Sequence, residues 1–160
     1  MDLSLVPVTI PEGCNVIIGQ THFIKTAEDL YEILIGTVPG AKFGVAFTEA
    51  SGPCLIRTEG NDEVLTKACV TALQAIGAGH VFCIYLKNAF PINVLNQIKS
   101  CPEVCRIFCA TANPLQVVVA ASPQGKGILG VIDGSSPLGV ETDNDRAARK
   151  AFLRKIGYKL

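Results

Sequence analysis

The sequence lacks several features that would place it in a large class of proteins. Its 14 Lys and Arg residues balance 14 Asp and Glu residues, and no basic run is present to neutralise a nucleic-acid backbone. No apolar run approaches the roughly 18 residues that span a bilayer, and the start of the chain has no basic region or apolar core typical of a signal peptide. We therefore expect a soluble cytoplasmic protein that binds neither nucleic acid nor membranes.

The usual patterns of a metal site are also missing. None of the seven cysteines forms a Cys-x-x-Cys pair, and neither of the two histidines lies in a His-Glu-x-x-His motif. Cys101, Cys105 and Cys109 recur every four residues, but this spacing alone does not predict a zinc or iron–sulfur site. We expect reduced thiols that pack as small apolar side chains.

The sequence does contain apolar residues, which make up 49% of its 160 residues and are distributed along the whole chain. This length and composition predict one folded domain, residues 1–160. The predicted strands cover residues 3–10, 15–19, 42–48, 54–58, 80–86, 104–110, 115–121 and 127–132, and helices are predicted to begin near Thr26, Asn61, Pro91 and Thr142. This irregular order predicts an α/β sandwich of α+β character, with a mixed sheet and about four helices.

The stretch from Ile76 to His80 is the first candidate site. Gly77 suits a helix end and Gly79 removes a side chain, so bare backbone N–H groups would lie beside the His80 imidazole and could hold an anion. The apolar run that follows predicts a central strand buried on both faces. The alternative interpretation is an ordinary glycine-rich turn with a hydrogen-bonding histidine.

The segment from Gly19 to Thr26 is the second candidate site. It has the glycine and the Lys-Thr pair of a phosphate-binding P-loop, but Ile24 occupies the position of the second glycine, so we reject a true P-loop. A helix N-terminus beside Lys25 and His22 could still bind an anion. The alternative is a helix-entry loop with a solvated lysine.

The third candidate is the segment from Gly125 to Gly130, which matches the dinucleotide-binding glycine pattern. That fingerprint requires a helix after the glycines, whereas a strand is predicted here. A hairpin could nonetheless hold phosphates with Gly127 and the charge of Lys126, although a plain tight turn is the simpler interpretation. Asp133 could bind Mg²⁺ or a ribose hydroxyl, or could form a turn with the glycine that follows it. The same choice between binding and turn formation applies to Glu49, Ser51 and Asn113.

Taken in order, several segments resemble the adenosine-specific kinase family, formerly an ancient conserved domain of unknown function. These segments are residues 15–32, 43–47, 49–53, 77–80, 88–93, 112–116, 127–130, 133–134 and 137–141. The chain departs from this family chiefly at its cysteines, where aliphatic residues are expected. The resemblance covers nearly the whole chain.

The resemblance implies a compact α/β homo-oligomer, a trimer or a pair of trimers, that binds adenosine or the adenine nucleotides AMP, ADP and ATP. It also implies a phosphate carried on a histidine, a role that we assign first to His80 and second to His22.

The chemistry expected is phosphoryl transfer between an adenosine nucleotide and a histidine, because an imidazole is nucleophilic near neutral pH. The backbone N–H groups of Gly77 and Gly79, with Lys25 and Lys126, would stabilise the transferring oxygens. Asp133 or Glu49 would hold Mg²⁺ or orient the imidazole. Two alternatives remain: an adenine-nucleotide sensor without turnover, and a structural oligomer whose glycines serve only turns.

Overall fold

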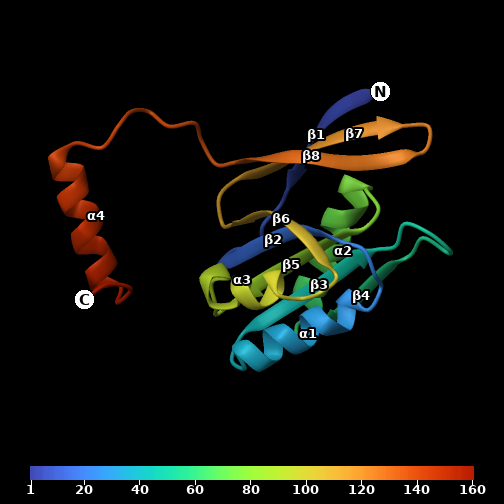
Figure 1. The fold of residues 1–160 in the computed structure, drawn as a ribbon, viewed down its shortest axis with the longest axis horizontal. Coiled ribbons are helices and arrows are strands. Elements are labelled where there is room, and N and C mark those ends of the chain that lie inside the picture. The colour runs from blue at the N-terminus through green and yellow to red at the C-terminus, as the bar shows by residue number, and fades with distance from the viewer.

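The computed structural model describes residues 1–160. Figure 1 shows a body, residues 1–133, followed by an extended arm, residues 134–160. The elements in chain order are β1 (Asp2–Val8), β2 (Cys14–Thr21), α1 (Thr26–Thr37), β3 (Lys42–Thr48), β4 (Ile56–Gly60), α2 (Glu63–Ile76), β5 (Val81–Lys87), α3 (Pro91–Lys99), β6 (Val104–Thr111), β7 (Leu115–Ser122), β8 (Gly125–Asp133) and α4 (Asp143–Lys155).

The strands form two sheets, and every pairing between neighbouring strands is antiparallel. The larger sheet has the order β4-β3-β5-β2-β6, and the smaller has the order β1-β7-β8. The predicted α+β sandwich with four helices is confirmed, as is the central position of β5. Two antiparallel sheets replace the single mixed sheet that we expected, because the three-stranded sheet pairs only within itself.

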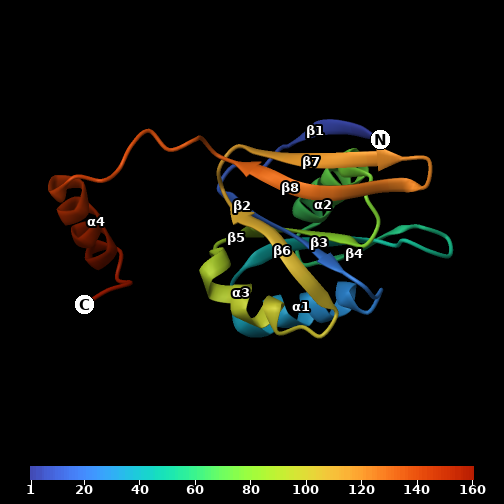
Figure 2. The same cartoon turned by 45° about the horizontal axis from the view of Figure 1, so that its top comes forward.

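The layers of the body are stacked on the five-stranded sheet (Figure 2). Helices α1 and α3 cover one face, where Leu34 and Ile98 pack against sheet residues such as Ile84. Helix α2 and the three-stranded sheet cover the other face and share the second apolar core. Residues of β5 contribute to both cores, which explains its uninterrupted apolar sequence.

Helix α2 packs very closely on β3. A Cβ atom on Gly44 would lie 2.3 Å from the backbone nitrogen of Thr66, so only glycine allows this approach. Asp62 caps the helix by accepting a hydrogen bond from the Leu65 N–H at 3.0 Å. The predicted cap, Asn61, instead donates to the Ala41 carbonyl. The helix ends as predicted at Gly77, whose φ is +67°.

Two other predicted boundaries differ from the structure. Lys25, not Thr26, is the N-cap of α1, and the Thr26 hydroxyl donates to the Phe23 carbonyl at 2.6 Å. The strand predicted at 54–58 is β4, which begins at Ile56 because the Glu49 N–H donates to the Leu55 carbonyl and closes the β3–β4 loop there. Thr142 caps α4 as predicted.

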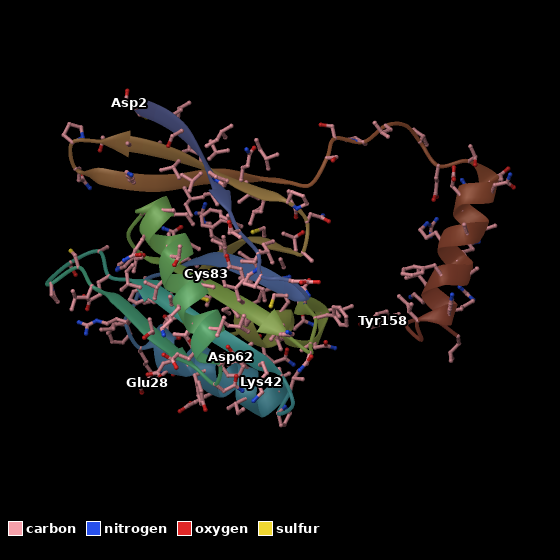
Figure 3. The ribbon with its side chains drawn as sticks, turned by 180° about the vertical axis from the view of Figure 1, so that it is seen from behind. Asp2, Glu28, Lys42, Asp62, Cys83 and Tyr158 are labelled. Carbon is pink, nitrogen blue, oxygen red and sulfur yellow. The ribbon has the colours of Figure 1, made fainter.

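The arm leaves the body after β8 and ends in α4. Every residue from Ser135 onward is exposed except the half-buried Leu153, and Figures 1 and 3 show α4 and Tyr158 standing apart from the body. No helix of the structure has the length and apolar character needed to cross a membrane.

Candidate functional site

A cavity of about 610 Å³ lies where β5 begins. The C-terminal end of α2, the β3–β4 loop and the tip of the β7–β8 hairpin converge on this side of the body (Figure 1). Six of the predicted site residues line the cavity: Glu49, Gly77, Gly79, His80, Lys126 and Gly127. Three segments that are distant in the sequence therefore form one site.

The backbone of His80 is fixed in a conformation that is uncommon for this residue. Its φ is +57°, in the left-handed region. Its N–H donates to the Thr48 carbonyl at 2.8 Å, and its carbonyl accepts from the Thr21 N–H at 3.0 Å. The imidazole packs against Phe47, with ring centroids 5.9 Å apart, and makes no hydrogen bond within the protein. The ring is therefore positioned by backbone and packing contacts, and its nitrogens are free for a ligand.

The buried side chain of Thr48 connects this loop to β3. Its hydroxyl donates to the Ala78 carbonyl at 2.8 Å and accepts from the Val81 N–H at 2.9 Å. These two bonds lie on either side of His80, and the Thr48 carbonyl binds His80 itself. Thr48 thus holds the strained backbone from both sides.

Lys126 supplies an unpaired positive charge to the cavity. A Cβ atom on Gly77 would lie 3.3 Å from Cδ and 3.4 Å from Nζ of Lys126, so the lysine side chain lies across the glycine. Lys126 makes no ion pair, and the N–H groups of Ala78 and Gly79 make no hydrogen bond within the protein. An ammonium group beside unpartnered N–H groups is suited to binding an anion.

The structure limits what the two glycines of the loop offer to a ligand, although Gly77 ends α2 as predicted. The Gly77 N–H donates to the Leu73 carbonyl and is already used. A Cβ on Gly79 would lie 2.9 Å from the Cβ of Ala50, so the absent side chain accommodates the β3–β4 loop.

Glu49 binds within its own loop. One carboxylate oxygen accepts from the Leu55 N–H and the other from the Arg57 guanidinium, both at 2.8 Å. The Leu55 N–H, followed by Arg57, lowers the pKa of Glu49 below its usual value. Each oxygen of Glu49 therefore accepts one hydrogen bond within the β3–β4 region, and Glu49 makes no hydrogen bond to the His80 imidazole.

Comparisons with known proteins identify the family of the chain. A family model described as adenosine specific kinase matches residues 6–159. The chain belongs to the adenosine-specific kinase family. The crystal structure of PH1918 protein from Pyrococcus horikoshii OT3 matches with a TM-score of 0.95 and 45% sequence identity, covering 99% of this chain and 98% of that chain. No curated protein matches the sequence.

In this member of the adenosine-specific kinase family, the second histidine lies outside the cavity. His22 is exposed, and its ring stacks on Phe23 with centroids 6.4 Å apart. It is nevertheless close to His80 in the backbone, because the preceding Thr21 donates its N–H to the His80 carbonyl.

Lys25 belongs to a separate ionic cluster, in which it binds Asp29 and lies 3.1 Å from the Glu103 carboxylate. The thiol of Cys101 donates to Glu103 at 2.8 Å. The hydrogen bond from Asp29, with those from Cys101 and Lys25, lowers the pKa of Glu103 to about 2. That same bond raises the pKa of Asp29, and burial raises the pKa of Cys101 to about 11.

This cluster also has the arrangement of a metal site. Ligand atoms of Asp29, Cys101 and Glu103 lie within 4.8 Å of one another. The ammonium of Lys25 already binds both carboxylates, so the protein itself offsets part of the negative charge of the cluster. A cavity of about 590 Å³ adjoins it but contains none of the predicted site residues.

The remaining predicted residues do not reach the His80 cavity. Asp133 accepts from the Thr111 hydroxyl at 2.7 Å and from the Asn113 amide at 3.0 Å. This network lies at the opposite end of β8 from Lys126, about 24 Å away at the usual rise of a strand. Ser51 is exposed in the β3–β4 loop and does not line the cavity.

Sequence reasoning missed three residues of this region. Gln20 and Cys54 line the cavity, and Thr48 supports His80 from behind. The signal for Gln20 was a polar residue near the end of the otherwise apolar strand β2. No local pattern distinguishes Thr48 from any threonine at the end of a strand.

Proposed function

We propose that this chain transfers a phosphoryl group from ATP to adenosine through a phosphorylated intermediate on His80. The observation that carries the proposal is the unengaged imidazole of His80 beside the unpaired Lys126 ammonium in one cavity. Membership of the adenosine-specific kinase family supports adenosine as the acceptor.

In the first step, a ring nitrogen of His80 attacks the terminal phosphorus of ATP. The new N–P bond forms as the bond between that phosphorus and the bridging oxygen breaks, and ADP leaves. The phosphorylated imidazole then releases its remaining ring proton to solvent. Lys126 and the N–H groups of Ala78 and Gly79 would hold the transferring oxygens, since such a transfer needs mainly positioning and charge stabilisation.

In the second step, a hydroxyl of adenosine attacks the phosphorus. The new O–P bond forms as the N–P bond breaks, the proton of the attacking hydroxyl passes to the imidazole, and AMP leaves. The sum of both steps converts ATP and adenosine to ADP and AMP and releases one proton to solvent. No step requires a carboxylate base, which agrees with the engagement of Glu49 by Arg57 and Leu55.

The structure favours His80 over His22 as the phosphate carrier. The His80 backbone directly precedes β5 and is held by two neighbouring strands, through Thr48 of β3 and Thr21 of β2. His22 is an exposed loop residue that shares no cavity with Lys126. A nucleophile gains most from fixed geometry.

The direct test is incubation of the pure protein with γ-labelled ATP, followed by analysis of base-stable, acid-labile label on the chain. We expect labelling of the wild type, a loss of about 100-fold or more in His80→Ala, and a change of less than about twofold in the matched control His22→Ala. Adding adenosine should discharge the label and produce labelled AMP. Equal labelling of both variants would overturn the assignment, and AMP binding by calorimetry without any transfer would instead indicate a nucleotide sensor.

A further inference from the structure

The side chain of Gln20 lines the His80 cavity and has no role in the chemistry described so far. Gln20 is the half-buried residue before the last one of β2. Successive side chains of a strand point to opposite faces, and Val16 and Ile18 of the same strand belong to the core beneath α2 and the three-stranded sheet. Gln20 continues this alternation, so its side chain faces the space between the two sheets at the end where the cavity lies.

The side-chain amide of Gln20 has no hydrogen-bond partner within the protein. Its cross-strand neighbours are Val81 on β5 and Arg106 on β6, and the amide is bonded to neither. A side-chain amide offers two N–H donors and one carbonyl acceptor, and leaving these groups unbonded in a partly buried position costs free energy. The cavity therefore contains an uncharged hydrogen-bonding group that is available to a ligand.

Gln20 lies beside the histidine that would carry the phosphate. It pairs with Val81, the residue after His80, and the Cβ atoms of directly opposed residues are about 4.5–5.5 Å apart. The next residue of β2, Thr21, donates its N–H to the His80 carbonyl at 3.0 Å. A ligand group that is held by Gln20 is therefore close to a phosphorus atom on the His80 imidazole.

The Gln20 amide and the backbone N–H groups of the loop approach His80 from different sides. Strands β3 and β2 flank β5 on opposite edges. The unpartnered N–H groups of Ala78 and Gly79 lie on the β3 side, where the Thr48 hydroxyl binds the Ala78 carbonyl, and Gln20 lies on the β2 side. Phosphate oxygens and an uncharged part of the substrate can therefore be bound at the same time.

The structures of the two substrates determine which uncharged group reaches Gln20. In ATP, two further phosphates separate the transferred phosphorus from the ribose, whereas in AMP the ribose is joined to that phosphorus directly through an oxygen. The sugar nearest to His80 during transfer is therefore the sugar of the acceptor.

We propose that Gln20 positions the acceptor by hydrogen bonding the 2′ and 3′ hydroxyl groups of the adenosine ribose while the 5′ hydroxyl attacks the phosphorus. An amide suits this contact because it both donates and accepts hydrogen bonds and carries no charge. The assignment rests on the proposed transfer to adenosine, and it places the effect of Gln20 in the second step, since the ribose of ATP is too far from His80 in the first.

The first test compares the two half-reactions in Gln20→Met, which keeps the length of the side chain but removes the amide. We expect the rate of labelling by ATP to fall less than about threefold and the rate of discharge by dilute adenosine to fall about tenfold, because two neutral hydrogen bonds are lost. Gln116→Met is the matched control, since Gln116 is exposed on β7 and does not line the cavity. An equal loss in both half-reactions would overturn the proposal, because it would indicate that Gln20 only supports His80.

Calorimetry gives a second readout that does not depend on transfer. The wild type should bind adenosine about tenfold more tightly than 2′,3′-dideoxyadenosine, and Gln20→Met should bind the two nucleosides within about twofold of each other. A wild type that does not distinguish the two, or a preference that survives in Gln20→Met, would overturn the role of Gln20. A wild type that shows the preference but takes no label from ATP would overturn the proposed phosphoryl transfer, and the loss of the preference in Gln20→Met would still support the contact between Gln20 and the ribose.

Discussion

Two clusters in this molecule place a lysine near groups that could take part in binding or catalysis. They differ in whether that lysine is paired with a carboxylate. Lys25 binds Asp29 and Glu103, and Glu103 also accepts from Cys101. Lys126 crosses Gly77 and has no carboxylate partner. In the first cluster the lysine is bound by carboxylates of the protein, whereas in the second an unpaired lysine and an imidazole line a cavity. A polar group left without a partner at the end of a well-packed strand is the better indicator of ligand binding.

The different roles assigned to Lys25 and Lys126 are tested most directly by replacing each lysine in turn. Lys126→Ala should weaken ATP binding about 30-fold, because a charge-assisted hydrogen bond to phosphate contributes about 2 kcal/mol, and should leave the unfolding free energy nearly unchanged. Lys25→Ala should lower the unfolding free energy and leave ATP binding nearly unchanged. Calorimetry and denaturant unfolding on both variants measure the two effects. Weaker nucleotide binding in Lys25→Ala alone would show that the two clusters had been assigned the wrong way round.

Thr48 offers a second test of the His80 cavity, because it positions His80 through hydrogen bonds to the backbone without contacting the cavity itself. Thr48→Val keeps the shape of the side chain but leaves the Val81 N–H and the Ala78 carbonyl without their partner. We expect the labelling rate with ATP to fall about tenfold, with a loss of about 1–2 kcal/mol in stability. Thr48→Ser restores the hydroxyl and should recover most of the rate. A rate that falls equally in both variants would indicate that packing, not hydrogen bonding, positions His80.

The Lys25 cluster predicts a pH dependence of stability. The pKa of Glu103 is lowered from an ordinary value near 4.5 to about 2, so its contribution is fully present above pH 4.5 and is lost as the pH falls through about 2. Glu103→Gln should lower the free energy of unfolding by about 1 kcal/mol at pH 7. The difference in unfolding free energy between this variant and the wild type should shrink toward pH 2.

The contribution of Asp29 to the pH dependence of stability has to be distinguished from that of Glu103. The raised pKa of Asp29 contributes with the opposite sign, so the unfolding curves should be repeated with Asp29→Asn in both backgrounds. A Glu103→Gln difference that stays constant from pH 7 to pH 2 would contradict the ionised state assigned to Glu103.

Local sequence patterns were sufficient for much of the fold. Gly77 ends α2 as predicted, Thr142 caps α4, and the apolar run after His80 is the central strand. These features depend on helix caps and on burial, which neighbouring residues encode. The division into two antiparallel sheets was missed because it depends on which distant strands pair.

The same limit applies to the site. Lys25 and Lys126 were both predicted to bind an anion, but Lys25 is paired with Asp29 four residues on and with Glu103, which lies 78 residues further along the chain. Asp133 similarly looked free until its bonds to Thr111 and Asn113 were known. Which polar groups remain unpartnered is a property of the tertiary structure, and it decides which candidates belong to the cavity.

The pairing of β1 with β7 has a consequence for synthesis of the chain. Asp2 lies opposite Ala121, so β1 leaves the ribosome long before its partner strand β7. Leu3 and Leu5 stay exposed throughout that interval, as does the inner face with Val6 and Val8. Closure of so large a loop is slow. The rate of translation up to the end of β7 therefore sets how long the apolar residues of β1 are accessible to chaperones or to incorrect association.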